Sequence, residues 1–204
     1  MKFYLRIIIN IEGLQMKEEY YPWGGEFTEC KPDGCVAVVI LNIDYVPPKN
    51  VAIYGSLKTE NIGIEKIVAN VISNPNIRYL ILCGDDIRGH RSGASLVALN
   101  KNGIDKQHRI IDAPGAIPYI ENLNEEAISR FQKQIKIINL IGNKSKEEIN
   151  EEILKCIKSA PESFGKPYIA IKIVSDIPIT LDDKRALHSK IVVDYMGKIK
   201  KRGN

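Results

Sequence analysis

The sequence lacks most of the features that mark membrane-spanning, secreted or nucleic-acid-binding proteins. No apolar run approaches the roughly 18 residues that a membrane helix needs, and the apolar N-terminal stretch, interrupted by Arg6, is too short for a signal peptide. The four cysteines are not spaced as zinc ligands, so we expect reduced thiols. Lysine and arginine number 29 against 25 aspartate and glutamate, a surplus too small to predict a nucleic-acid partner. These absences favour a cytoplasmic protein without a membrane span.

The composition that remains is typical of a folded domain. Hydrophobic residues make up 44% and charged residues 26% of the chain, which predicts a globular core. We expect an N-terminal strand at residues 3–11 and an aromatic-rich loop, together residues 1–34, followed by a core domain at residues 35–166. The remaining segment, residues 167–204, is expected to be a small extension. Two β-like runs fall in that extension, at residues 169–174 and 191–193.

Apolar runs and amphipathic stretches alternate through the core domain. Strands are expected at residues 36–41, 51–54, 78–83, 108–112 and 136–141. Helices are expected at residues 59–73 and 92–101, and from Asn124 and Ser145 onward. This alternation is the pattern of an α/β protein, and we predict a Rossmann-like, mostly parallel sheet with helices on both faces.

Capping residues predict where these helices begin and end. Thr59 and Asn124 are expected to cap the starts of two helices. Ser145 and Glu148 have the spacing of a reciprocal capping box. Gly103 is expected to end the helix at residues 92–101.

Three loops follow strands of the predicted sheet, and ligands of such sheets bind at the carboxyl ends of the strands. In the loop at residues 55–60 and the following helix start, the candidate cofactor-binding residues are Gly55, Ser56, Leu57, Lys58, Thr59 and Asn61. In the loop at residues 84–93 and its helix start, they are Gly84, Asp85, Gly89, His90, Ser92, Gly93 and Ser95. In the loop at residues 113–122, they are Ala113, Pro114, Gly115, Ala116, Ile117 and Pro118.

The loop at residues 84–93 is the most informative of the three. Its glycines fit neither a dinucleotide fingerprint nor a Walker A loop. His90 lies between Gly89 and Gly93, and a single imidazole is too few ligands for a bare zinc or iron ion. One imidazole suffices when a macrocycle already supplies four equatorial nitrogens, which favours a tetrapyrrole-type cofactor with His90 on the metal. Asp85 and Asp86 either orient this imidazole or serve as ordinary loop and cap carboxylates.

Several ordered runs of this sequence resemble the A subunit of tetrahydromethanopterin S-methyltransferase, a corrinoid-binding protein of methanogens. The matching runs are residues 58–66, 74–78, 82–84, 89–93, 102–103, 115–122 and 130–134. The resemblance extends over roughly residues 36–161. It implies a Rossmann-like domain that holds a cobamide, accepts a methyl group from methyl-tetrahydromethanopterin on Co(I) and passes it to coenzyme M. Partner proteins would present the methyl donor and the methyl acceptor, so turnover would need them.

The resemblance also assigns a role to His90. It implies that the histidine of the Gly-His-x-x-Gly stretch is the axial cobalt ligand. The common corrinoid motif Asp-x-His-x-x-Gly is not kept, because Arg88 occupies the position of its aspartate. Asp85, Asp86 or a backbone carbonyl would therefore have to orient the imidazole. Membrane-bound members of the family end in a hydrophobic anchor, whereas this chain ends in a polar tail, so we expect a soluble homologue without that anchor.

Two other interpretations of the sequence stay open. The chain could be a non-catalytic, Rossmann-like corrinoid- or nucleotide-binding regulatory module. It could also be a nucleotide- or phosphate-binding enzyme that uses the loop at residues 84–93 as an anion nest. Retention of a corrinoid by the protein would separate the leading interpretation from those in which the chain binds a nucleotide or a phosphate.

Overall fold

The computed structural model describes residues 20–159, 161–170, 191–193 and 199–201. The chain divides into two units, Met1–Lys172 and Ile173–Asn204, which are described separately below. The expected strand at residues 3–11 lies outside the described residues, as does most of the β-like run at residues 169–174. The domain boundaries at residues 34 and 166 stay predictions.

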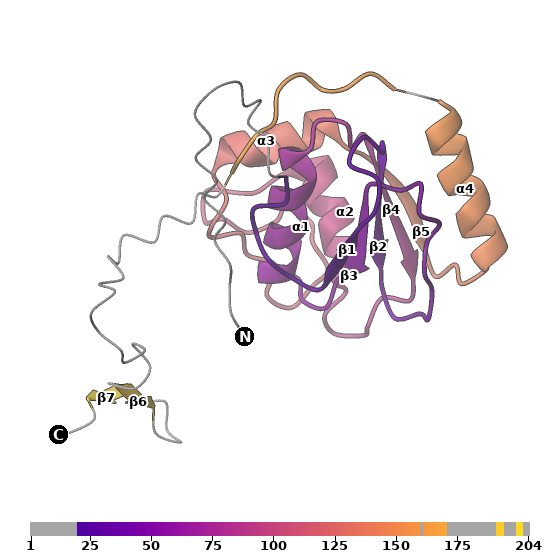
Figure 1. The fold of residues 1–204 in the computed structure, drawn as a ribbon. Coiled ribbons are helices and arrows are strands. Elements are labelled where there is room, and N and C mark those ends of the chain that lie inside the picture. The colour runs from indigo at the N-terminus through magenta and orange to yellow at the C-terminus, as the bar shows by residue number, and fades with distance from the viewer. Residues whose placement is uncertain (1–19, 160, 171–190, 194–198, 202–204) are drawn as a thin grey trace. The chain divides into compact units, whose positions relative to one another are not determined.

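A five-stranded, mostly parallel sheet forms the centre of the first unit (Figure 1). Its strands are β1 (Phe27–Glu29), β2 (Val36–Ile40), β3 (Ile53–Ser56), β4 (Tyr79–Gly84) and β5 (Lys136–Ile141). Their order across the sheet is β1-β3-β2-β4-β5. β1 is antiparallel to β3, and the other neighbouring pairs are parallel. The predicted α/β fold is therefore confirmed.

Helices cover both faces of this sheet (Figure 1). The helices α1 (Ile62–Ser73), α2 (Ser92–Asn102) and α3 (Glu125–Gln134) pack on one face, and α4 (Lys146–Lys158) packs on the other. The alternation of side chains along β2 explains this division, because Ala37 and Val39 join the core under the three helices whereas Val36 and Val38 join the core under α4. Every residue of β2 is buried, which is why its sequence is a continuous apolar run.

Two of the predicted helix ends are confirmed and two differ in detail. The Asn124 side chain accepts a hydrogen bond from the Ala127 N–H at 2.8 Å, and so caps α3. At the end of α2, Gly103 adopts a φ of 74° and its N–H donates to the Leu99 carbonyl.

The start of α1 is three residues later than the prediction. Asn61 is its N-cap and accepts from the Ile62 N–H at 2.8 Å, while the Thr59 hydroxyl accepts from the Gly63 N–H at 3.0 Å. Thr59 therefore supports the first turn from outside the helix.

Only half of the predicted capping box forms at α4. The Ser145 hydroxyl accepts from the Glu148 N–H at 3.2 Å. The Glu148 carboxylate accepts instead from the Asn143 side-chain amide at 2.6 Å, and the Ser145 N–H donates to Asn143 at 2.8 Å. Asn143 therefore takes the place of Glu148 as the acceptor for the Ser145 N–H.

The sequence prediction is wrong at two strands of the first unit. The segment that was expected to be an aromatic-rich loop contains the edge strand β1, which the sequence did not predict. Residues 108–112 form no regular strand, because His108 and Asp112 have φ values of 63° and 58°, outside the extended region. Isolated bridges join Ile104 to Ile110 and Arg109 to Tyr119 instead.

The second unit contains a short antiparallel pair of strands. The strands β6 (Ile191–Val193) and β7 (Ile199–Lys201) pair along their three residues. The predicted β-like run at residues 191–193 is confirmed, whereas β7 was not predicted.

Gln134 ties three segments together where β4 and β5 begin. Its side chain is 1% exposed. Its Nε2 donates to the carbonyl oxygens of Val71, Asn74 and Ile77 at 3.2, 2.9 and 3.1 Å. Its Oε1 accepts from Arg130 Nε at 2.7 Å. One amide thereby satisfies carbonyl groups at the end of α1 and in the turn that leads into β4.

The segment that follows α4, residues 161–170, contacts the same end of the sheet, where β4 and β5 begin. The Cζ atoms of Arg78 and Arg130 lie 5.1 and 4.6 Å from the ring centroid of Phe164. Further along, the Tyr168 N–H donates to the Ile72 carbonyl at 3.3 Å. Within the part of the chain described, no helix is long and apolar enough to cross a membrane. The cytoplasmic location stays a prediction from the sequence.

Candidate functional site

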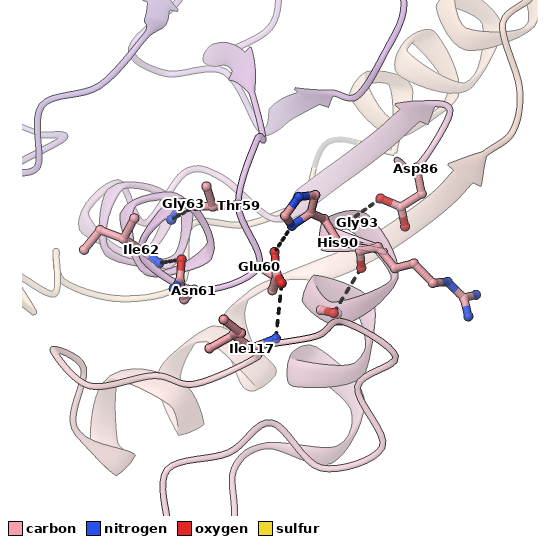
Figure 2. A network of polar contacts seen from close by, with 11 residues as sticks. Thr59, Glu60, Asn61, Ile62, Gly63, Asp86, His90, Gly93 and Ile117 are labelled. Atoms are coloured by element: carbon pink, nitrogen blue, oxygen red, sulfur yellow. Dashed lines mark hydrogen bonds and ion pairs between the residues drawn. The ribbon is translucent and has the colours of Figure 1, made fainter. Parts of the chain in front are cut away.

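The three predicted ligand loops converge on one buried carboxylate at the carboxyl ends of the parallel strands (Figure 2). Glu60, in the loop between β3 and α1, is 4% exposed. Its Oε2 lies 3.1 Å from Nδ1 of His90, in the loop after β4. Its Oε1 accepts from the Ile117 N–H at 3.2 Å, in the loop before α3. Glu60 thus connects one residue of each of the other two loops.

The Glu60 carboxylate determines which nitrogen of His90 is free. Burial alone would raise the pKa of Glu60, but hydrogen bonds from its own N–H, from the Ile117 N–H and from His90 hold this pKa below its ordinary value. An ionised carboxylate accepts a hydrogen bond only from a protonated Nδ1, so the neutral imidazole keeps its lone pair on Nε2. Within the described residues Nε2 has no partner, and the His90 side chain is 58% exposed. The ring is fixed on one side and accessible on the other.

Asp85 and Asp86 do not orient the imidazole. The Asp85 carboxylate pairs with Lys144 Nζ at 2.5 Å. The two oxygens of Asp86 accept from the N–H groups of Gly93 and Ala94 at 2.8 and 2.7 Å (Figure 2). Asp86 therefore caps the start of α2, and the interpretation of these two residues as loop and cap carboxylates is confirmed.

The backbone on both sides of His90 is left-handed. Gly89 has a φ of 90°, and Arg91 has a φ of 44° and a ψ of 44°. Arg91 is exposed and its side chain makes no capping hydrogen bond. A non-glycine residue in this region costs about 1–3 kcal/mol, so the loop presents His90 at the expense of backbone strain.

Replacing Arg91 with glycine is therefore expected to raise the free energy of unfolding by about 0.5 kcal/mol, because the relief of strain exceeds the added entropy of the unfolded chain. Arg88→Gly is the matched control, since Arg88 is exposed in the same loop and has no positive φ. Arg88→Gly is expected to lower the free energy of unfolding, because glycine adds entropy to the unfolded chain and no strain is relieved. Urea denaturation measures both, and equal losses in the two variants would contradict the assignment of strain to Arg91.

The loop at residues 113–122 packs closely against the His90 loop. An ideal Cβ on Gly115 would lie 2.7 Å from the His90 carbonyl oxygen, 2.7 Å from Ser95 Oγ and 3.1 Å from Glu60 Cγ. Any side chain at this position would push the two loops apart. Gly115 is therefore the residue that lets the third loop reach the imidazole.

The remaining predicted site residues have other contacts in this structure. Leu57 is 4% exposed, and Lys58 Nζ pairs with Glu26 at 2.5 Å. A Cβ on Gly55 would meet the Glu26 carbonyl at 2.7 Å, so this glycine serves the close pairing of β3 with β1. The structure therefore brings together Glu60, His90, Gly115 and Ile117, whereas Gly55 and Lys58 contact residues near β1, Leu57 is buried and Ser56 is exposed.

Exposed isoleucines lie in two of the three loops and at the first position of α1. Ile62, Ile87 and Ile117 are 41%, 50% and 58% exposed. Of these three, Ile117 is the one tied to the site, because its N–H donates to Glu60 beside His90. In the described ranges no group of three or more His, Cys, Asp or Glu side chains is placed to hold a bare metal ion.

Two glutamates in this region are not among the predicted site residues. An acidic residue at a helix start is ordinary, and nothing in the sequence places Glu60 next to His90. Glu65, in the first turn of α1, is 2% exposed and accepts from the N–H groups of Glu121 and Asn122. The only signal in the sequence is that both glutamates and residues 121–122 fall within the runs that carry the family resemblance.

Comparison with known proteins assigns the sequence to one family. The sequence profile of a family described as the A subunit of tetrahydromethanopterin S-methyltransferase matches residues 15–177. The first of the A subunits of that enzyme from Methanothermobacter thermautotrophicus is 47% identical over 153 residues, which cover 73% of this chain and 64% of the relative. A relative from Methanosarcina acetivorans, named as the A subunit of a methyltransferase Mtx, is 48% identical over 134 residues, which cover 66% of this chain and 68% of the relative. The second A subunit from Methanobrevibacter ruminantium is 43% identical over 153 residues, with 73% and 79% covered. The match thus spans just under two thirds of the first of these relatives.

Proposed function

Because this chain belongs to the A-subunit family of tetrahydromethanopterin S-methyltransferase, we propose that it binds a cobamide and carries a methyl group, with His90 as the axial ligand of the cobalt. The proposed donor is methyl-tetrahydromethanopterin and the proposed acceptor is coenzyme M, each presented by a partner protein. A bound cobamide supplies four equatorial nitrogens and a cobalt that can hold a methyl group.

The observation that carries the proposal is the Glu60–His90 pair. A buried carboxylate 3.1 Å from Nδ1 leaves Nε2 with its lone pair on the accessible side of the ring. This is the arrangement that metal-ligating histidines use, in which a second group fixes the tautomer and the direction of the ring.

The residues around the imidazole fit a corrin ring. Ile117, which is exposed next to the Glu60–His90 pair, would offer apolar surface to a macrocycle, and Gly115 keeps the third loop close to the main chain of His90. Glu60 holds the proton on Nδ1, and Ile117 holds Glu60 through its N–H. In this proposal the chain's own residues would hold the cofactor by presenting one oriented imidazole nitrogen, and the cofactor would supply the site that carries the methyl group.

The anion-nest alternative is less well supported. The N–H groups of Gly93 and Ala94 at the start of α2, which a phosphate would need, are already bonded to Asp86 at 2.8 and 2.7 Å. A phosphate at this helix start would have to displace a carboxylate that belongs to the chain.

Reconstitution tests the proposal directly. The purified protein is mixed with hydroxocobalamin, passed through a gel-filtration column, and analysed for cobalt and for visible absorption. We expect retained corrinoid in a stoichiometric ratio. Loss of all corrinoid on the column would contradict the proposal, and stabilisation against heat by nucleotides in the same sample would favour the nucleotide-binding alternative.

A further inference from the structure

Two buried carboxylates five positions apart at the start of α1 hold the same loop. Glu60 accepts from the N–H of Ile117 in the middle of the loop at residues 113–122. Glu65 accepts from the N–H groups of Glu121 and Asn122 at its end, the second at 2.9 Å, and from Asn122 Nδ2 at 2.6 Å. Both carboxylates are at most 4% exposed. The loop is therefore attached at two points, to α1 through Glu65 and to the segment just before α1 through Glu60.

The position of this loop decides whether it reaches His90. Gly115 lies against the His90 carbonyl, and Ile117 next to it is 58% exposed. The loop has no helix or strand of its own, and its backbone hydrogen bonds at Pro118 and Ile120 go to residues 108–110, another irregular segment. Glu65 supplies polar contacts between this loop and α1, whereas Glu60 ties it to the loop before α1, so the glutamate away from His90 has a separate task.

We propose that Glu65 is a positioning residue for the cofactor site: it fixes the 121–122 end of the loop so that Gly115 and Ile117 stay beside His90. This inference rests on the proposed function, since the loop is positioned for the cofactor. Glu65 itself does not reach His90 in this assignment and acts only through the loop. A carboxylate suits the task because all three of its partners are N–H donors.

The test compares Glu65→Gln with Glu121→Gln. A glutamine at position 65 would present its N–H₂ group, a donor, to partners that are themselves donors. The Glu121 side chain is exposed, and only the backbone N–H of this residue bonds to Glu65, so Glu121→Gln keeps that bond. Both variants remove one negative charge from the same region. Hydrogen exchange of the amides at residues 117–122 is measured without cofactor, and the dissociation constant for hydroxocobalamin is measured by visible absorption.

For Glu65→Gln we expect exchange at residues 121–122 to rise about tenfold and corrinoid affinity to fall about tenfold, the range seen when supporting groups of a metal site are removed. At saturating corrinoid the His90-dependent absorption should be unchanged, because the ligand itself is intact. Glu121→Gln should change neither quantity. Faster exchange with unchanged affinity would overturn the positioning role while leaving the proposed function standing.

A milder variant keeps the test decisive if Glu65→Gln does not fold. Asn122→Ala removes one donor to Glu65 and leaves both main-chain contacts. Its corrinoid affinity should fall by about threefold, less than for the glutamine variant. Unchanged affinity in this folded variant would overturn the proposal. Absence of binding in the wild-type protein would instead overturn the proposed function, and the positioning role with it.

Discussion

Replacing His90 with alanine is expected to change the visible spectrum of the bound corrinoid to that of a cobamide without a protein nitrogen on the cobalt. The affinity for hydroxocobalamin should fall about tenfold or more, since the axial ligand is lost along with its support by Glu60. The imidazole is 58% exposed, so the fold should be retained, with a change in unfolding free energy of about 0.5 kcal/mol or less. Visible absorption and a thermal melt of the same sample measure these effects.

His108→Ala is the matched control for this experiment. His108 presents a similar arrangement, with Nδ1 lying 3.0 Å from the Ile120 carbonyl oxygen, and it is exposed. If the assignment of His90 is right, the spectrum of the loaded His108 variant should equal that of the wild type. A spectrum that depends on His108 and not on His90 would assign the axial ligand to His108.

Replacing Gln134 with alanine is expected to lower the free energy of unfolding by about 3 kcal/mol, the largest loss of stability among these variants. The change takes the Gln134 donor from the carbonyl groups of Val71 and Ile77, takes one of two donors from the Asn74 carbonyl, and deprives Arg130 of an acceptor, in a position that is 1% exposed. Chemical denaturation in urea, followed by circular dichroism, measures the loss.

Gln132→Ala provides the comparison, because it removes the same side chain from an exposed position of the same helix. Its effect should stay within about 0.5 kcal/mol of the wild type. Equal midpoints for the two variants would show that the buried amide contributes nothing beyond helix propensity.

The elements that the sequence predicted well are those whose pattern is local. The run of buried residues in β2 and the apolar face of α3 are visible in a window of a few residues. The strand expected at residues 108–112 failed because its apolar residues are few and two positions adopt positive φ, which no residue type there announces. The edge strand β1 escaped for a different reason, since its three residues are stabilised by pairing with β3, a contact made across the fold.

The candidate site shows the same limit. The glycines around His90 and the position of this loop after β4 led to His90 as the candidate ligand, which stays a prediction. The carboxylate that orients it is thirty positions earlier in the chain, and the two aspartates that are closer in sequence are bonded elsewhere. Proximity in sequence is a poor guide here, because parallel strands bring loops together that are separated by whole βα units.

The fastening of residues 161–168 has a consequence for how this domain can work. Arg78 and Ile72, which contact that segment, lie where β4 begins and α1 ends, whereas His90 follows the end of β4. The segment at residues 161–168 is therefore held at the opposite end of β4 from His90. In the proposed function, the attachment of this segment and the cofactor site lie at opposite ends of the same strand.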